Sequence, residues 1–433
     1  MSINSRVVSL EIICDVYNKL KFDESIKNNK KFQSLDSRDQ SFVKMLVLTF
    51  LRRNGEIDKI IKEFLKKPLN KKVHEIKNII RIGITQILFL DVKDYSAVDT
   101  CVEISKKIMP GMAALVNAVL RKVSKNKNNI INNLNTLDNL PEWIKIKLIQ
   151  NFGLEATKKI ADKIIETPYL DIKIKKNIFK KKEWDSLLKG FNIYGETIRK
   201  KSYGKVDFLP FYDDGHWWVQ NLAASLPVEI LNYLSSINNY LDKQILEIGS
   251  APGGKTLQLC ENNFNVTALD ISEKRIKLLN ENLKRTGFKA NIINKDVLEW
   301  KSKKKFCFVL IDAPCSASGL LSRKPEILIN GEDKNIKNLV IKQKKILSKT
   351  ASFLSAGGFM IYSVCSLIKE EAENQISSFL IKNKNFKLLK INKNMLGDID
   401  CYYRNGMIYC TPICMREKGG LDGFFIACLK REF

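Results

Sequence analysis

The sequence predicts an α/β protein in which an all-α domain precedes a Rossmann-like sheet domain. Three observations lead to this prediction. The first 125 or so residues place apolar side chains at helical spacing and contain few Gly or Pro residues. After residue 241, short apolar runs alternate with helical stretches, which is typical of a parallel sheet with crossover helices. A glycine-rich loop follows the first of these runs and precedes a helix.

The 433 residues divide into three predicted parts. We expect a helical domain at 1–130, a small α/β connector at 138–235 and the sheet domain at 236–433. The Lys- and Asn-rich stretch 122–133 reads as the linker that ends the helical domain. The expected strands of the sheet domain are 245–248, 266–269, 290–293, 306–311 and 359–362, followed by two antiparallel runs around 419–420.

Charge and composition indicate the class of partner. The chain has 73 Lys and Arg against 47 Asp and Glu, a formal net charge of +26, and 45% hydrophobic residues. This balance favours a polyanionic partner, most simply nucleic acid, although Lys, Ile and Asn are abundant throughout the chain. No run approaches the roughly 18 apolar residues of a membrane span, and Glu11 and Asp15 interrupt any signal peptide. We therefore expect a cytoplasmic monomer that binds RNA, with no membrane and no obligate protein partner.

Cysteine and histidine usage argues against a metal site. Ten cysteines in a chain of this length do not indicate a disulfide scaffold, and the two histidines lie far apart in sequence. The four cysteines of the C-terminal region, at 401, 410, 414 and 428, contain no C-x-x-C pair. We expect no metal. Trp217 and Trp218 could stack on a base, but packing at a domain junction is the favoured reading.

The glycine-rich loop has two readings. Residues 249–256 fit the phosphate-binding pattern G-x-x-x-x-G-K-[ST], and Asp312 ends an apolar run as a magnesium ligand would, so a nucleoside triphosphatase is an alternative. Asp270, however, follows the first glycine by about twenty residues, a spacing that suits ribose hydroxyls. Asp296 follows the third expected strand, in a position suited to an adenine amino group. A ligand with adenosine and little negative charge, S-adenosylmethionine (SAM), fits these acidic residues better than ATP.

Cys315 and Cys365 each follow an expected strand, so both thiols should lie at the carboxyl ends of strands, where open α/β sheets bind ligands. A cysteine at a strand end is usually a small buried hydrophobic residue. That reading suits the cysteines at 14, 101, 260 and 307. The motifs around Cys315 and Cys365 instead favour covalent chemistry.

Those motifs resemble the Sun-type cytosine-5 RNA methyltransferases. The resemblance is carried by A-P-G-G-K-T at 251–256, D-A-P-C-S at 312–316 with Gly319, Y-S-x-C-S at 362–366 with E-N at 373–374, and L-D-G-F-F at 421–425. The amino-terminal half is similar to NusB-type RNA-binding domains through residues 46–53, 81–86 and 116–121. This fusion is typical of the branch that methylates 16S ribosomal RNA. The chain departs from the family at Val364, Lys324 and Glu247, where Thr, Arg or His, and Asp are usual.

The resemblance implies a fold, an activity and a set of site residues. The sheet domain would be a SAM-dependent methyltransferase domain that modifies carbon 5 of a cytosine in 16S rRNA, of the cytosine-967 type. Cys365 would be the nucleophile that attacks carbon 6, Cys315 would assist loss of the carbon-5 proton or product release, and Asp312 would hold the base. The implied SAM-binding residues are Gly249, Ser250, Ala251, Pro252, Gly253, Gly254, Lys255, Asp270, Asp296 and Asp312. The RNA-binding candidates are Arg52, Arg53, Arg121, Arg323 and Lys324.

Three alternatives stay open from the sequence. The same chemistry could act on tRNA or on another rRNA site. The chain could be an RNA-binding assembly factor without catalytic activity, against which the presence of both thiols argues. It could also be the triphosphatase that the glycine loop permits, which would bind ATP and not SAM.

Overall fold

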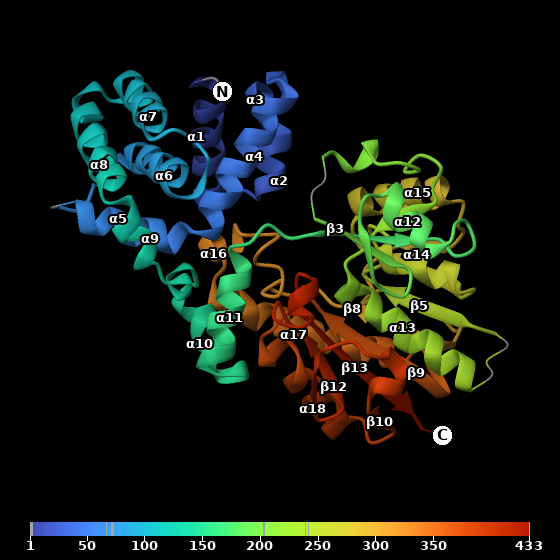
Figure 1. Ribbon diagram of the computed structural model, residues 1–433. Coiled ribbons are helices and arrows are strands. Elements are labelled where there is room, and N and C mark those ends of the chain that lie inside the picture. The colour runs from blue at the N-terminus through green and yellow to red at the C-terminus, as the bar shows by residue number, and fades with distance from the viewer. Residues whose placement is uncertain are drawn as a thin grey trace. The chain divides into compact units, whose positions relative to one another are not determined.

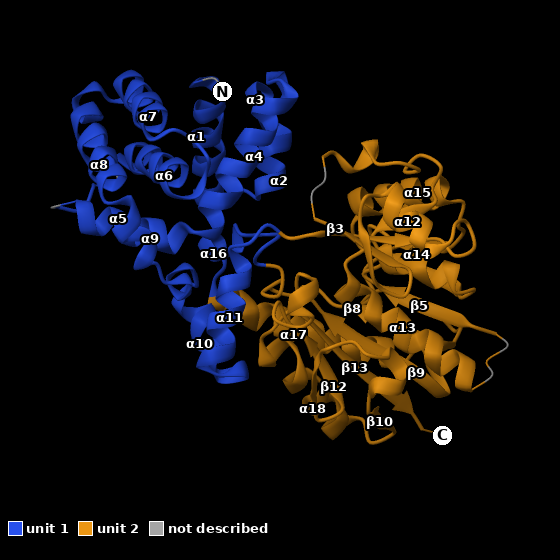
Figure 2. Cartoon of the chain, in the orientation of Figure 1, with its two compact units in different colours: residues 1–167, 321–332 blue, residues 168–320, 333–433 orange. Residues whose placement is uncertain are grey.

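The computed structural model describes residues 3–65, 67–70, 73–201, 204–238, 240 and 242–432, and it divides into two compact units (Figure 2). The first unit comprises residues 1–167 and 321–332, and the second comprises 168–320 and 333–433. The boundary falls inside the stretch 138–235 that was predicted as a connector. Among the described residues, the helices are too short or too polar to span a bilayer.

The first unit is entirely helical in its described part, which confirms the predicted helical domain (Figure 1). Phe42, Leu46 and Phe50 recur on one face of α4 and are all buried, as the helical spacing predicts. The elements are α1 Ile3–Tyr17, α2 Phe22–Asn28, α3 Lys30–Ser34, α4 Ser37–Arg52, α5 Asn54–Phe64, α6 His74–Phe89, α7 Asp94–Ile108, the 3-10 turn Pro110–Met112, α8 Ala113–Lys125, α9 Lys127–Asn132, the 3-10 turn Thr136–Asn139, α10 Glu142–Phe152, α11 Leu154–Ile164 and α16 Ile327–Asn330.

The stretch 122–133 is not a linker, so that prediction was wrong. It contains the end of α8 and all of α9. Val123 and Ile130 stand seven residues apart and are both buried in the helical core. Two apolar contacts two turns apart are enough to order a segment whose Lys and Asn residues face solvent.

Residues 321–332 leave the sheet-bearing unit and complete the helical one. Asn330 Nδ2 donates to Val16 O at 2.7 Å, and Arg52 Nε donates to Ser322 O at 2.9 Å. Trp143 Nε1 donates to Gly331 O at 3.1 Å. The C-terminal half of the sequence therefore contributes a short segment, including α16, to the helical domain.

The second unit begins with a small antiparallel sheet in the order β2-β3-β1-β4. Its elements are β1 Leu170–Ile174, α12 Lys181–Leu187, β2 Phe191–Tyr194, β3 Thr197–Lys200, the 3-10 turn Val206–Phe208 and β4 Trp217–Val219. Trp217 and Trp218 are buried, Trp217 donating to Pro210 O at 2.7 Å and Trp218 to Gly254 O at 3.1 Å. The favoured packing role of these two rings is confirmed.

Among the described residues a nine-stranded sheet follows, in the order β11-β12-β13-β9-β8-β5-β6-β7, with β10 also paired to β13. Strands β5 to β9 pair in parallel, and β13 runs antiparallel to β9. The strands are β5 Gln244–Ile248, β6 Asn265–Asp270, β7 Asn291–Asn294, β8 Phe306–Asp312, β9 Leu354–Val364, β10 Phe386–Leu389, β11 Tyr402–Arg404, β12 Met407–Cys410 and β13 Phe424–Arg431. The Rossmann-like fold is confirmed.

Helices fill the crossovers and cover the sheet. They are α13 Leu222–Ile237, α14 Gly254–Glu261, α15 Glu273–Thr286, α17 Asp333–Ala351, the 3-10 turn Lys369–Glu371, α18 Glu373–Lys382, α19 Lys393–Leu396 and the 3-10 turn Arg416–Lys418. Leu226 of α13 and Leu279 of α15 share one buried cluster with Phe308 and Ile361 of the central strands. The chain crosses to β6 on one side of β5 and to β8 on the other, so a topological switch point lies at the carboxyl end of β5.

Candidate active site

The glycine loop occupies the switch point and needs its glycines. Gly249 has a φ of +74°, and a Cβ there would lie 2.4 Å from the backbone oxygen of Asp312. Gly253 has a φ of +114°, and its Cβ would lie 2.7 Å from Leu279 Cδ1. Both positions therefore exclude other residues. The loop backbone passes close against the end of β8.

Asp270, predicted to bind ribose hydroxyls, ends β6 with its side chain turned toward the glycine loop. Oδ2 accepts a hydrogen bond from Ala251 N at 3.1 Å, and Oδ1 accepts one from Ser272 N at 2.9 Å. Arg275 closes the arrangement by donating to Ala251 O. The carboxylate fastens the glycine loop, and its role toward ribose stays a prediction.

Lys255 forms a partly buried ion pair with Asp312 instead of pointing into an open phosphate site. Its Nζ lies 2.7 Å from Asp312 Oδ2 and 5.2 Å above the ring of Phe424. Glu247, the next acidic group, is buried beneath the loop and accepts a hydrogen bond from Thr256 Oγ1 at 2.6 Å. Burial raises the pKa of Glu247 to about 8.

The charged side chains around the glycine loop fit SAM better than a triphosphate. Asp270 and Asp312 bring two carboxylates to the loop, and Lys255 is already paired with one of them, so a triphosphate would meet negative charge. A sulfonium cation joined to adenosine meets no such penalty. Asp296, predicted to lie near adenine, stands beyond β7 and accepts from Leu298 N at 2.9 Å in a tight turn. Gly249 to Lys255 would line the ligand, since their backbone forms the edge of the switch point.

The two predicted thiols are in contact. Cys315 Sγ lies 3.2 Å from Cys365 Sγ. The parallel register that pairs Asp312 with Ser363 brings their loops together, and Gly319 N donates to Cys365 O at 3.1 Å. The hydrogen bond with Cys365, followed by burial, raises the pKa of Cys315 well above its ordinary value. Cys315 is therefore a neutral thiol at neutral pH and can donate its S–H to Cys365.

The L-D-G-F-F motif at 421–425 runs into the start of β13 and contacts the loop that carries Cys315. Gly423 N donates to Gly319 O at 2.7 Å, and a Cβ on Gly319 would lie 2.0 Å from Gly423 O. Phe424 lies under the Lys255 ammonium. The close approach of two glycines across the fold could be found from sequence only by pairing motifs that are about one hundred residues apart.

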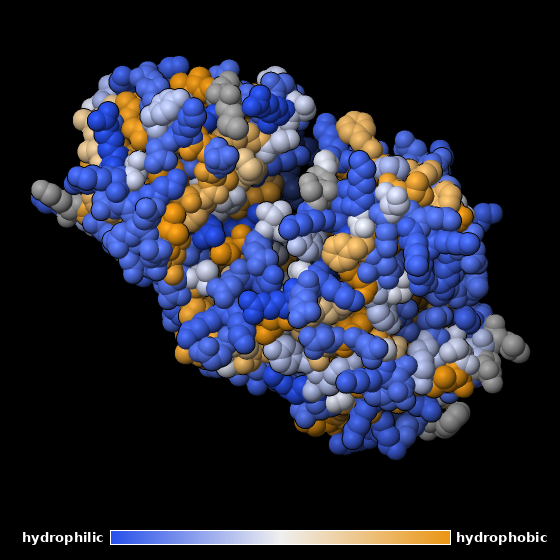
Figure 3. Space-filling model, in the orientation of Figure 1, coloured by the Kyte–Doolittle hydropathy of each residue, from blue (hydrophilic) through white to orange (hydrophobic). Residues whose placement is uncertain are grey.

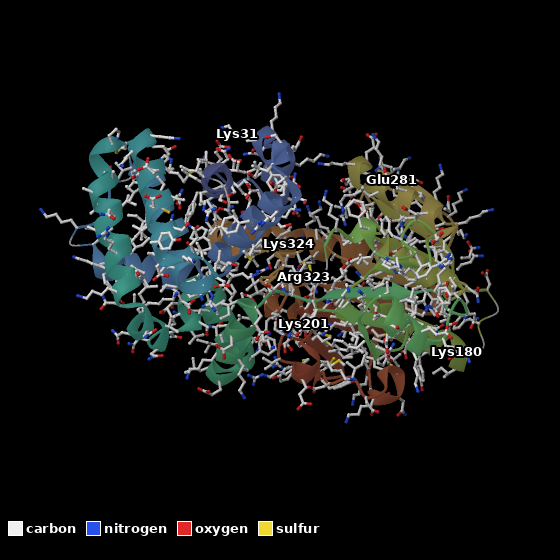
Figure 4. All side chains as sticks on the ribbon, turned by 45° about the horizontal axis from the view of Figure 1, so that its top comes forward. Lys31, Lys180, Lys201, Glu281, Arg323 and Lys324 are labelled. Atoms are coloured by element: carbon white, nitrogen blue, oxygen red, sulfur yellow. The ribbon has the colours of Figure 1, made fainter. Side chains whose placement is uncertain are left out.

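The predicted RNA-binding residues lie in different surroundings. Arg52 is buried and holds the 321–332 segment through Ser322 O. Arg53 pairs with Glu56 at 2.8 Å, whereas Arg121 is exposed. Arg323 and Lys324 stand next to each other on the 321–332 segment (Figure 4), with Lys324 exposed and Arg323 partly so. Contact of these residues with RNA stays a prediction.

The visible face of each unit is largely hydrophilic, with apolar residues in small groups (Figure 3). This agrees with the high content of Lys and Arg. Within the described part of the chain, no group of three or more His, Cys, Asp or Glu side chains is arranged to hold a metal ion.

Comparisons with known proteins identify the family. A family model described as 16S rRNA methyltransferase RsmB/F matches residues 235–430, and a NusB family model matches residues 3–125. The chain is 29% identical over 372 residues to ribosomal RNA small subunit methyltransferase B of Shigella flexneri, covering 82% of this chain and 85% of that protein. The same figures hold for the protein of that name from Klebsiella pneumoniae (strain 342).

Solved structures agree on the fold. The crystal structure of PH0851 superposes with a TM-score of 0.76 at 21% identity and covers 100% of this chain and 99% of that one. The structure of NSun6 from Pyrococcus horikoshii with SFG has a TM-score of 0.58 at 19% identity and covers 68% of this chain and 99% of that one. The fold and the glycine-loop site define a SAM-dependent methyltransferase. Residues 235–430 match the RsmB/F methyltransferase family, and residues 3–125 match the NusB family.

Proposed function

We propose that this protein methylates carbon 5 of a cytosine in 16S ribosomal RNA, with Cys365 as a covalent nucleophile. The observation that carries the proposal is the contact between two thiols at 3.2 Å, at the carboxyl ends of β8 and β9, one of them three residues after Asp312. A SAM-dependent enzyme that methylates a nucleophilic oxygen or nitrogen needs neither thiol. Methylation of an aromatic carbon needs a group that first activates the ring.

The chemistry assigns a task to each side chain. The Cys365 thiolate adds to carbon 6 of the base, the carbon 5–carbon 6 double bond opens, and carbon 5 becomes nucleophilic. Carbon 5 takes the methyl group, whose former bonding pair stays with the sulfur of the donor. A base then removes the carbon-5 proton, the double bond re-forms and the Cys365 thiolate leaves. Asp312, beside this point, would bind N3 and the exocyclic amine, where charge changes during the reaction.

Cys315 would serve the last part of this sequence. Its raised pKa means that it approaches Cys365 as a neutral S–H donor, which stabilises the Cys365 thiolate before addition and after release. After Cys365 has bonded to carbon 6, the Cys315 sulfur lies beside the nucleobase. The hydrogen bond to Cys365 and the charge of Cys365, two of the causes of the raised pKa of Cys315, are then gone. Cys315 can release its proton to solvent, and its thiolate can take the carbon-5 proton. Its absence would leave the covalent adduct slow to resolve.

SAM supplies the methyl group as a sulfonium cation when it is bound. We infer that residues 249–255 line it, that Asp270 and Asp296 bind its ribose and adenine, and that Asp312 lies between SAM and the base. The Asp312–Lys255 ion pair holds that carboxylate in place at the end of β8. The side chains thus orient both substrates around one point.

The RNA assignment rests on charge and on the family. The chain carries a net charge of +26, and its NusB domain precedes the methyltransferase domain. The relatives are named for small-subunit ribosomal RNA, so we propose a 16S rRNA target of the cytosine-967 type. All ten cysteines are free thiols, in keeping with a reaction in the reducing cytoplasm.

The proposal is tested with the purified protein, SAM carrying a radiolabelled methyl group, and three RNAs: 16S rRNA transcripts, 23S rRNA transcripts and tRNA. Bisulfite sequencing of the product locates 5-methylcytosine. We expect transfer to one cytosine of 16S rRNA and none with Cys365→Ser. Transfer to tRNA or 23S rRNA instead would refute the target, and a methyl group on any atom other than carbon 5 would refute the chemistry.

A further inference from the structure

Each of the two site cysteines is followed directly by a serine, and both serines donate to one buried carboxylate. Ser316 Oγ and Ser366 Oγ each lie 2.6 Å from Glu371 Oε2, and Ser316 N lies 2.9 Å from Glu371 Oε1. Glu371 is fully buried at the end of a 3-10 turn, five residues after Ser366. A single side chain is therefore bonded to the loop that carries Cys315 and to the loop that carries Cys365.

The carboxylate has a full set of donors. Gln343 of α17 completes it, because its Nε2 donates to Glu371 Oε1 at 3.1 Å and to Pro314 O at 2.9 Å. Each carboxylate oxygen thus accepts two hydrogen bonds, as an ionised, acceptor-only group can. Tyr362 of β9 donates to the Glu371 backbone oxygen at 2.8 Å, which fixes the turn itself. The site cannot exchange one partner for another without leaving a buried donor unpaired.

We propose that Glu371 is a positioning residue that holds the two thiols at their working distance by joining the Ser316 and Ser366 loops. This role rests on the proposed function of the thiol pair and deepens it. The two sulfurs belong to separate loops beyond the ends of β8 and β9, where the strand ladder no longer fixes their spacing. The repeated Cys-Ser sequence then has a physical reason, since each serine places its cysteine relative to a common anchor.

The charge of Glu371 also acts on the thiols. It is one of the causes of the raised pKa of Cys315, after the hydrogen bond that Cys315 donates to Cys365, burial and the charge of Cys365. A negative charge on this side of the pair disfavours ionisation of Cys315. Loss of that charge should therefore let Cys315 ionise at lower pH and weaken its ability to donate to Cys365.

The test compares Glu371→Gln with Glu370→Gln in the full-length protein. Glu370 precedes Glu371 in the same 3-10 turn and is partly exposed, so its variant is a matched control. We expect Glu371→Gln to lower kcat of methyl transfer about a hundredfold, with the KM values for SAM and RNA retained, because misplacement of a reacting group acts on the chemical step. Iodoacetamide labelling of Cys315, measured peptide by peptide from about pH 6 to pH 10, should shift to lower pH. The control should match the wild type in both measurements.

The labelling needs no RNA, so it separates this role from the proposed function. If the pH dependence of Cys315 labelling shifts but the protein methylates no cytosine, the positioning role of Glu371 is supported and the proposed substrate is refuted. An unchanged kcat together with an unchanged profile in folded Glu371→Gln would overturn the anchor. If Glu371→Gln does not fold, Ser316→Ala and Ser366→Ala test the positioning role of Glu371 instead. A lower kcat in each single variant, with no further loss in the double variant, supports one shared anchor at Glu371. Wild-type kcat in both single variants overturns the proposal.

Discussion

Arg199 and Asp171 form a buried ion pair that fastens the small sheet to the methyltransferase sheet, and its removal gives the largest stability change that we predict. Arg199 Nε and Nη2 lie 2.6 and 2.8 Å from the two oxygens of Asp171, and the residues are 2% and 1% exposed. Nη1 also donates to Lys418 O at 2.9 Å and to Gly420 O at 2.6 Å. Gly423, which packs against Gly319 on the loop that carries Cys315, lies three residues further along the chain.

Arg199→Met leaves the Asp171 carboxylate buried with hydrogen bonds from Asn221 Nδ2 and Leu222 N but without a counter-charge. Breaking a buried pair in this way costs about 3–5 kcal/mol of unfolding free energy. Urea unfolding followed by tryptophan fluorescence measures it, because four of the five tryptophans lie in the second unit.

Two further variants make that experiment decisive. Lys277→Met removes an exposed i,i+4 pair with Glu273 on α15 and should leave the unfolding midpoint at the wild-type value. Arg199→Met combined with Asp171→Leu removes both charges and should recover part of the loss. A loss below about 1 kcal/mol in Arg199→Met would refute the reasoning, because a pair this buried cannot be replaced by solvent.

Three other outcomes are expected. Burial raises the pKa of Glu247 from 4.5 to about 8, so the folded protein holds a proton that the unfolded chain releases. The free energy of unfolding should therefore fall as pH rises from about 4.5 to about 8. In thermal unfolding, Glu247→Gln should lack this pH dependence. Gly319→Ala would force its Cβ against Gly423 O and should lower kcat about a hundredfold, whereas Gly111→Ala, with open space around it, should not. RNA affinity should fall linearly with salt on a log–log plot, and a flat line would contradict phosphate contacts.

The sequence predicts the sheet well because each central strand is an apolar run bounded by breakers. The strand predicted at 359–362 is longer in the structure, at 354–364, and its pairing with β8 shifts register between Phe306 and Phe308. Periodicity within a window also reveals the helices of the first unit. The stretch 122–133 is helical despite its Lys- and Asn-rich composition, because Val123 and Ile130 are spaced to reach the helical core.

The sequence predicts the site residues that stand in recognisable motifs. It does not predict the residues whose role depends on packing in the folded protein. Cys315, Cys365 and Asp312 stand in motifs at strand ends, and the structure brings them together. Glu371 lies in the charged run at 369–373, which reads as a solvated surface, and only the fold shows that it is buried. The transfer of residues 321–332 to the helical unit depends on contacts such as Arg52 with Ser322, 270 residues apart.

The most direct test of the account is the fate of the covalent bond between Cys365 and the base. Cys315→Ala and Cys365→Ala are each incubated with SAM and the methyl-accepting RNA, then denatured and resolved by size. We expect a denaturation-stable protein–RNA complex that accumulates with Cys315→Ala, because the adduct forms but resolves slowly. We expect no such complex with Cys365→Ala. A stable complex with Cys365→Ala, or methyl transfer by that variant, would contradict the assignment of Cys365 as the nucleophile.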